Sequence, residues 1–138
     1  MINVTTIDRA RAGEDPTHDP YVDRAHYFAG EVNVQSLVGP ETSGDVELLA
    51  VFFAAGARTR PHVHERDQIL HYVEGRGIVA TMAEKHHLVA GDVVIIPAGT
   101  WHWHGAARDV EACHISIRQP GHTDWEVEDG NWATGYDE

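Results

Sequence analysis

The stretch GARTRPHVHERDQILHYVEG, residues 56–75, places several histidines and a glutamine between two glycines. Side chains alternate between the two faces of a strand, so His62, His64 and Gln68 lie on one face if the chain is extended here. Imidazole nitrogens and amide oxygens are ligands for divalent transition metals. Imidazoles grouped on short, glycine-bounded strands are hard to explain by packing alone. The stretch therefore predicts strands that carry metal ligands.

A second glycine-bounded stretch, GDVVIIPAGTWHWH at residues 91–104, adds two further histidines. Its apolar run predicts a buried strand over residues 93–96, ended by a turn at residues 97–99. His102 and His104 then share one strand face. We expect His102 to join the metal ligands. His104 either ligates the metal or lines the pocket beside it, and we favour the pocket.

The last predicted strand, residues 112–118, has two chemically different faces. His114, Ser116 and Arg118 share one face, and three apolar residues share the other. The wall of a barrel would give this pattern, with the polar face lining a cavity and the apolar face forming core. The six remaining histidines are expected at the surface or in ordinary hydrogen bonds: His18, His26, His71, His86, His87 and His122.

The rest of the chain is organised as short strands between glycine-bearing turns, with almost no helical periodicity. Strands are expected at residues 27–38, 46–53, 62–73, 78–82, 93–96, 102–104 and 112–118. Turns are expected at residues 54–60 and 74–77, and a hairpin tip at 84–87. This pattern predicts an all-β sandwich or barrel. We divide the chain into an N-terminal arm (1–26), a barrel (27–120) and an acidic tail (121–138) that packs on the barrel or on a partner subunit.

Composition excludes several classes of protein. The 138 residues suit one domain, and the net charge of −12 argues against nucleic acid or an anionic membrane as partner. The single cysteine permits no intrachain disulfide. No secretory leader opens the chain, and no apolar run approaches the roughly 20 residues of a membrane span. We therefore expect a soluble cytoplasmic protein.

The two stretches resemble the paired motifs of the cupin superfamily. The first cupin motif has His-x-His and then Glu between two glycines, and Gln68 stands at the glutamate position. The second motif has Pro-x-Gly, then His, then Asn; here these positions hold Pro97, Gly99, His102 and Ala106. The resemblance implies a double-stranded β-helix, or jelly-roll barrel. It also implies one divalent metal per chain (Mn, Fe, Co, Ni or Zn) and a homodimer.

Residues 102–107, 114–117 and 124–125 are similar to small bacterial cupins with manganese-dependent hydroxynitrile lyase activity. Those proteins carry glutamine at the fourth ligand position and a histidine base on a late strand. The resemblance implies that His114 is the base and that His104 stabilises the departing anion. It implies four metal ligands: His62, His64, Gln68 and His102. The expected activity is therefore a metal-dependent C–C lyase acting on cyanohydrins.

The neutral ligand set has a chemical consequence, because a glutamate ligand would cancel one metal charge and Gln68 does not. A divalent metal would keep its full charge and act as a stronger Lewis acid. The substrate's apolar part is expected against four side chains that are otherwise plain core: Leu49, Val51, Leu70 and Tyr72. Arg118 either anchors a carboxylate or phenolate or is a charge at the outer rim.

The same metal site and histidine base would also serve other functions. A Lewis acid and an imidazole base also suit a polyketide cyclase, an isomerase or a decarboxylase, and a redox metal suits a dioxygenase acting on an aromatic small molecule. A non-catalytic, ligand-binding cupin is the alternative of a different class. Against a regulator of transcription, the chain has no segment that reads as DNA-binding, and its charge is acidic.

Overall fold

The computed structural model describes residues 1–12 and 24–135, and the regular structure there is almost entirely β. Helical structure in this part of the chain is limited to a 3-10 turn, η1 (Arg9–Arg11), and a short helix, α1 (Arg24–Tyr27). The strands are β1 (Phe28–Ala29), β2 (Val32–Val38), β3 (Glu47–Phe53), β4 (Arg58–Thr59), β5 (Val63–His64), β6 (Gln68–Ala80), β7 (Lys85–Val89), β8 (Val93–Ile96), β9 (Trp103–Ala106), β10 (Ala112–Arg118) and β11 (Thr123–Asp124).

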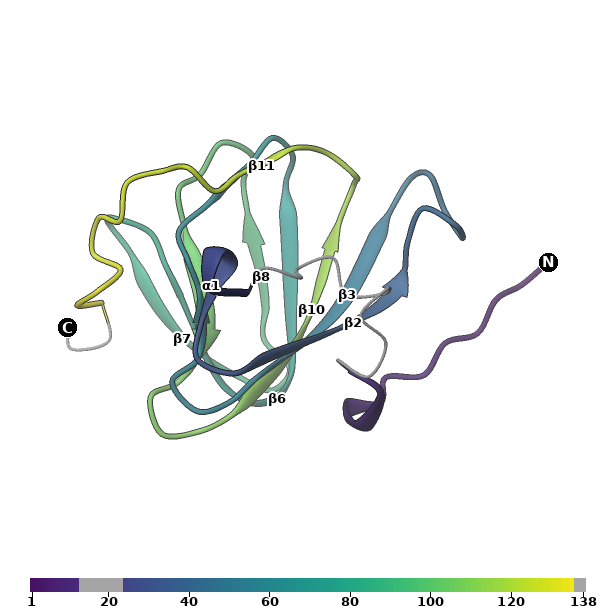
Figure 1. The fold of residues 1–138 in the computed structure, drawn as a ribbon, viewed down its shortest axis with the longest axis horizontal. Helices are drawn as coiled ribbons and strands as arrows, with labels where there is room; N and C mark the ends of the chain where they lie inside the picture. Colours follow the sequence, from purple (N-terminus) through teal and green to yellow (C-terminus); the bar gives the residue numbers. More distant parts are fainter. Residues whose placement is uncertain (13–23, 136–138) are drawn as a thin grey trace.

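The strands wrap into a barrel with non-sequential neighbours (Figure 1). The sheet order is β1-β4-β9-β6-β10-β3-β2, with β7 and β8 also paired to β6. The pairings are antiparallel. β5 pairs separately with β11 from the C-terminal segment. The all-β jelly-roll barrel expected from the sequence is confirmed.

Strand β6 belongs to both halves of the barrel wall. Its first part pairs with β8 and β10, and its last part pairs with β7 and β9. The turn predicted at residues 74–77 is therefore wrong, because the chain stays extended and bends from one set of partners to the other. Gly75 permits the bend: its φ is +73°, and a Cβ there would collide with the carbonyl oxygen of Glu111. Glycines mark such bends as readily as turns.

The hairpin after β6 turns earlier than expected. The sequence predicted a tip at residues 84–87, but the Thr81 N–H donates to the Glu84 carbonyl oxygen (2.8 Å), so the turn lies between these two residues. The Thr81 hydroxyl accepts from the Glu84 N–H at 3.0 Å and fixes the turn. His86 and His87 consequently lie on β7, paired with β6, and both are exposed.

The hydrophobic core and the cavity share the inner face of the barrel. Inward side chains of β2, β3 and β6 form the main core cluster, and His114 lines a cavity on the same inner side. Ile115 and Ile117, on the opposite face of β10, are not part of that core. The expected division into a core face and a cavity face is therefore right only in part. Cys113, on the face opposite His114, is buried in a second cluster with Ala50 and Phe52, but the main core shares the barrel interior with the cavity.

The C-terminal segment runs along one end of the barrel (Figure 1). The Trp132 indole N–H donates to the Thr59 carbonyl oxygen at 2.8 Å. The guanidinium groups of Arg58 and Arg60 each lie 4.4 Å from the Trp132 ring centroid. Cation–π contacts and a hydrogen bond therefore hold this part of the predicted tail against the barrel wall.

The predicted N-terminal arm is described in part, because residues 13–23, His18 among them, lie outside the described residues, as do residues 136–138 of the tail. η1 packs on the outer face of the sheet, where the Arg9 guanidinium lies 4.7 Å from the Phe52 ring and 2.7 Å from a Glu74 carboxylate oxygen. Within the described ranges, no helix is long and apolar enough to span a membrane.

Candidate metal centre

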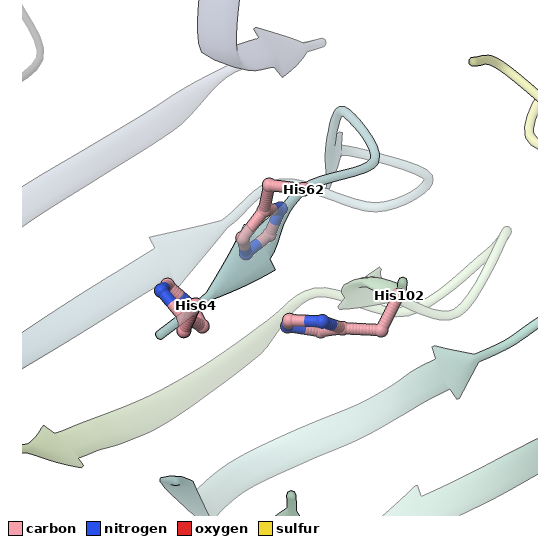
Figure 2. A group of neighbouring side chains, drawn as sticks. All are labelled: His62, His64 and His102. Atoms are coloured by element: carbon pink, nitrogen blue, oxygen red, sulfur yellow. The ribbon is translucent and has the colours of Figure 1, made fainter. Parts of the chain in front are cut away.

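Three buried imidazoles meet inside the barrel (Figure 2). His62 and His102 come from segments 40 positions apart, and an isolated antiparallel bridge joins their backbones: each N–H donates to the other's carbonyl oxygen, at 3.0 and 3.2 Å. His64 follows on β5. One ring nitrogen from each residue lies within 4.8 Å of those of the others. The arrangement could hold a divalent metal.

Backbone carbonyls set the tautomer of two of these histidines. The Nδ1 of His62 lies 2.8 Å from the Arg60 carbonyl oxygen, and the Nδ1 of His102 lies 2.9 Å from the Thr100 carbonyl oxygen. A carbonyl oxygen only accepts, so each Nδ1 carries the proton and donates it. The Nε2 atoms of both rings therefore present lone pairs.

The side-chain oxygen of Gln68 lies beside the imidazole nitrogens of the cluster. Its Oε1 lies 3.0 Å from the Nε2 of His64 and 3.2 Å from the Nε2 of His102. Its amide nitrogen donates to the Ser116 hydroxyl at 2.8 Å, which directs the oxygen toward the imidazoles. The Nε2 of His102 and the Gln68 oxygen face each other as two acceptors without a hydrogen between them. A cation among them would satisfy both, so the residues present fit a divalent metal.

Burial keeps the imidazoles of the site neutral. Desolvation, followed by the neighbouring His102, lowers the pKa of His64 to about 3, and desolvation lowers the pKa of His102 to about 4. Desolvation also holds the pKa of His62 well below its ordinary value. At neutral pH the rings therefore have free lone pairs, which is the form that binds metals.

A second histidine pair lies beside the cluster. The Nε2 of His114 and the Nδ1 of His104 are 3.0 Å apart, so one proton joins the two rings. The other two ring nitrogens, His104 Nε2 and His114 Nδ1, are buried without a hydrogen-bond partner among the described residues. Desolvation lowers the pKa of His114 to about 3 and holds the pKa of His104 well below its ordinary value. The pair is neutral at pH 7.

Two members of the cluster, His62 and His64, and both members of the pair line one cavity of about 30 Å³. Its described lining residues are Phe28, Leu49, Val51, Thr59, His62, His64, Gln68, His104, His114, Ser116 and Trp125. Two of the apolar residues expected against a substrate, Leu49 and Val51, are in this lining. Leu70 and Tyr72 are not: both are fully buried in the core, and the Tyr72 hydroxyl donates to the Gly105 carbonyl oxygen at 2.9 Å.

Comparisons with known proteins agree with this geometry. The cupin domain family matches residues 49–118, a range that contains both histidine motifs. The chain belongs to the cupin family. Over 98 residues this cupin is 34% identical to the (R)-mandelonitrile lyase of Granulicella tundricola, covering 69% of the chain and 73% of the relative. A 46-residue match, 39% identical, to the acireductone dioxygenase of Parasynechococcus marenigrum covers 30% of the chain and 25% of that enzyme.

The fold itself has a close solved counterpart. A crystal structure of a cupin-like protein from Thermotoga maritima superposes with a TM-score of 0.72 and is 35% identical. The superposition covers 80% of this cupin and 85% of the Thermotoga chain.

Several residues of this cupin's site were not among those expected from the sequence. Trp125 stacks on His62, with ring centroids 4.1 Å apart and planes 25° from parallel. Phe28 and Thr59 reach the cavity from other segments. No local signal ties Trp125, Phe28 and Thr59 to the site. Ser116, by contrast, lies on the cavity face that strand alternation predicted for it. Arg118 lies outside the cavity lining and bonds Glu47 instead, at 2.9 Å.

Proposed function

We propose that this cupin is a metal-dependent lyase that cleaves the C–C bond of a cyanohydrin to an aldehyde and hydrogen cyanide. The observation that carries the proposal is that three candidate ligands, His62, His64 and Gln68, line the same cavity as a histidine pair with two unpaired ring nitrogens, in the described part of the chain. His102 lies next to them in the histidine cluster. The relative named (R)-mandelonitrile lyase, 34% identical to this chain, supports it.

The proposed ligands are His62, His64, Gln68 and His102. All four are neutral, so a bound divalent metal would supply a Lewis acid of undiminished charge toward an alkoxide. The chain contributes the orientation of the lone pairs. The Arg60 and Thr100 carbonyl oxygens fix two imidazoles, and the Ser116 hydroxyl fixes the amide.

Proton transfer is assigned to the His104–His114 pair. When His114 Nε2–H donates to His104 Nδ1, the unpaired His114 Nδ1 is a base and the unpaired His104 Nε2 carries a proton. His114 takes the proton of the substrate hydroxyl. The C–C bond then breaks, and its electrons leave with cyanide as the aldehyde forms. His104 Nε2–H protonates the cyanide while the His114 Nε2 proton moves to His104 Nδ1, so hydrogen cyanide forms and both rings end neutral. One neutral pair thus supplies a base and an acid together.

The cavity walls indicate the kind of substrate. Phe28, Leu49, Val51 and Trp125 offer apolar surface around the polar groups. This composition suits a small molecule with one apolar, preferably aromatic, substituent beside its hydroxyl and nitrile. A volume of about 30 Å³ holds about two or three waters, since a water needs about 10–15 Å³. An aryl cyanohydrin therefore enters only when a wall moves.

The test combines metal analysis with an assay of mandelonitrile cleavage. We expect about one divalent ion per chain after supplementation and release of benzaldehyde. His114→Ala should keep the metal and lose turnover by about 10²–10⁴-fold. His71→Ala is the matched control, because His71 lies on the opposite face of β6, paired with Ile115. Wild-type turnover in His114→Ala would contradict the assigned base, and a metal-free wild type would contradict the site.

A dioxygenase is the second candidate, favoured by the local similarity to acireductone dioxygenase. An oxygenase needs O₂, whereas cyanohydrin cleavage does not. Assays under strictly anaerobic conditions separate the two. Unchanged mandelonitrile cleavage without O₂ supports the lyase. Turnover of an electron-rich substrate only in air would favour the dioxygenase.

A further inference from the structure

The three imidazoles of the metal centre are not held alike. His62 and His102 each donate from Nδ1 to a backbone carbonyl oxygen. The Nδ1 of His64 instead meets the Thr123 hydroxyl at 2.8 Å and the Arg118 Nη1 at 3.2 Å. A hydroxyl can donate or accept, so this environment does not by itself fix the proton on Nδ1.

Two tautomers of His64 therefore compete. In one, Nδ1–H donates to the Thr123 hydroxyl, and Nε2 presents a lone pair that can bind a metal. In the other, Nδ1 accepts from the Thr123 hydroxyl or from Arg118, and Nε2–H donates to the Gln68 oxygen, 3.0 Å away. The second tautomer satisfies the ring but blocks ligation, because its Nε2 carries a proton.

The position of Arg118 leaves the Thr123 oxygen able to accept from His64 in the first tautomer. Its Nη1 lies 2.8 Å from the Thr123 oxygen, closer than the 3.2 Å to His64. Its Nε donates to Glu47 at 2.9 Å, and the two side chains are only 13% and 24% exposed. Glu47 thus holds the guanidinium where it donates to the hydroxyl. The hydroxyl oxygen still has a lone pair for His64 Nδ1–H.

We propose that Thr123, held by Arg118 and Glu47, is a positioning residue that selects the metal-binding tautomer of His64. Thr123 lies on β11, which pairs with β5 so that Thr123 stands opposite His64. The segment after the barrel therefore contributes to the ligand geometry, although it holds none of the proposed ligands. The inference rests on the metal site of the proposed function.

The decisive variant is Thr123→Val, which keeps the shape of the side chain and removes the acceptor. Calorimetric titration of the metal-free full chain with Mn²⁺ and with Zn²⁺ should show affinity about 10–100-fold weaker than wild type. Thr123→Ser should restore it to within about threefold, because the hydroxyl returns. Thr134→Val, at an exposed threonine of the same segment, is the matched control and should bind as wild type.

A second readout needs no metal. In metal-free protein labelled with ¹⁵N-histidine, the fraction of His64 protonated at Nδ1 should fall in Thr123→Val and return in Thr123→Ser. Melting curves show whether the variants are folded, and the serine variant keeps the test informative if valine disturbs packing.

The outcomes separate the two proposals. Wild type and Thr123→Val with equal metal affinity and equal His64 tautomers would overturn the role of Thr123 while leaving the metal site intact. A wild-type protein that binds neither metal would overturn the metal site, and the tautomer comparison then decides the role of Thr123. An equal loss in Thr123→Ser and Thr123→Val would also overturn that role, because a packing defect would then explain both.

Discussion

Among single residues, Gln68 sets the charge of the candidate centre. Its amide nitrogen donates to Ser116, and its oxygen faces two imidazoles. An amide oxygen carries no net charge, so the four proposed ligands are all neutral. This choice weakens the attraction for a cation. It also makes any bound metal a stronger Lewis acid.

Gln68→Glu separates these two effects. The carboxylate should bind a divalent metal more tightly, because it adds a negative charge of nearly the same shape. It should also lower cyanohydrin turnover by about tenfold or more, because the charge on the metal is partly neutralised. Calorimetry and steady-state kinetics at full metal occupancy measure both. Equal or faster turnover in the variant would show that ligand charge does not limit the reaction.

His62→Ala tests the cluster as a metal site. Removing one of the ligands should leave the purified protein with little bound metal, since the remaining donors no longer enclose the ion. His87→Ala is the control, because His87 is exposed on β7. Mass spectrometry of metal content after dialysis gives the answer. A full complement of metal in His62→Ala would place the ion elsewhere.

Among the structural elements, the C-terminal segment covers one side of the site. β11 pairs with β5, and the next residue, Trp125, stacks on His62 at 4.1 Å. The Trp125 ring also meets the Tyr27 ring edge-on, with centroids 4.9 Å apart. One segment thus touches a proposed ligand and forms part of the cavity wall.

Trp125→Ala should widen substrate selection. Without the indole the cavity gains room beside His62, so bulky cyanohydrins should improve relative to mandelonitrile. We expect the ratio of their kcat/KM values to shift by about tenfold. Trp125→Phe, which keeps a ring, should shift it less. An unchanged ratio in Trp125→Ala would mean that this segment does not limit substrate size.

The bend in β6 is the second structural feature that depends on one residue, because it requires a glycine at position 75. Gly75→Ala should lower the free energy of unfolding by about 2–4 kcal/mol, because the new Cβ meets the Glu111 carbonyl oxygen and the backbone keeps a positive φ. Gly91→Ala is the matched control: its φ is +100°, but no described atom lies within 4 Å of the added Cβ. Urea unfolding measures the free energy of unfolding of both variants. Equal losses of stability would show that the positive φ alone, and not the contact with Glu111, causes the destabilisation.

For the molecule as a whole, burial of neutral histidines links stability to pH. Desolvation lowers the pKa of His114 to about 3 in the folded state, whereas an unfolded chain restores a value of about 6.5. Between these values the unfolded chain binds more protons. The stabilisation from His114 is therefore complete above about pH 6.5 and is lost as pH falls toward 3.

We expect the free energy of unfolding of metal-free protein to fall as the pH is lowered from about 7.5 to about 5. His114→Leu should show a shallower fall, because one buried titrating group is gone. Urea unfolding at several pH values measures both curves. Superimposable pH profiles of wild type and variant would contradict the contribution of His114.

The homodimer implied by the cupin resemblance stays a prediction. Light scattering on the purified protein should give twice the 15.3 kDa mass of the chain. A species of the single-chain mass at micromolar concentration would contradict it.

Local sequence patterns were enough to establish the all-β class, the cupin family and the grouping of three histidines. Alternation along strands puts His62 and His64 on one face, and glycine spacing bounds the motifs that contain them and His102. The same local rules misplaced the turn at residues 74–77, because a glycine's positive φ serves a bend within a strand as well as a turn.

The surroundings of the three histidines depend instead on tertiary contacts. The alternation of side chains along β6 put Leu70 and Tyr72 on the inner face. Alternation does not say how far along the barrel the cavity extends. Thr123 and Trp125 reach His64 and His62 because β11 pairs with β5, a contact between segments far apart in the chain. No local pattern encodes such a contact, since it forms only when the barrel closes and brings the two segments to the same end.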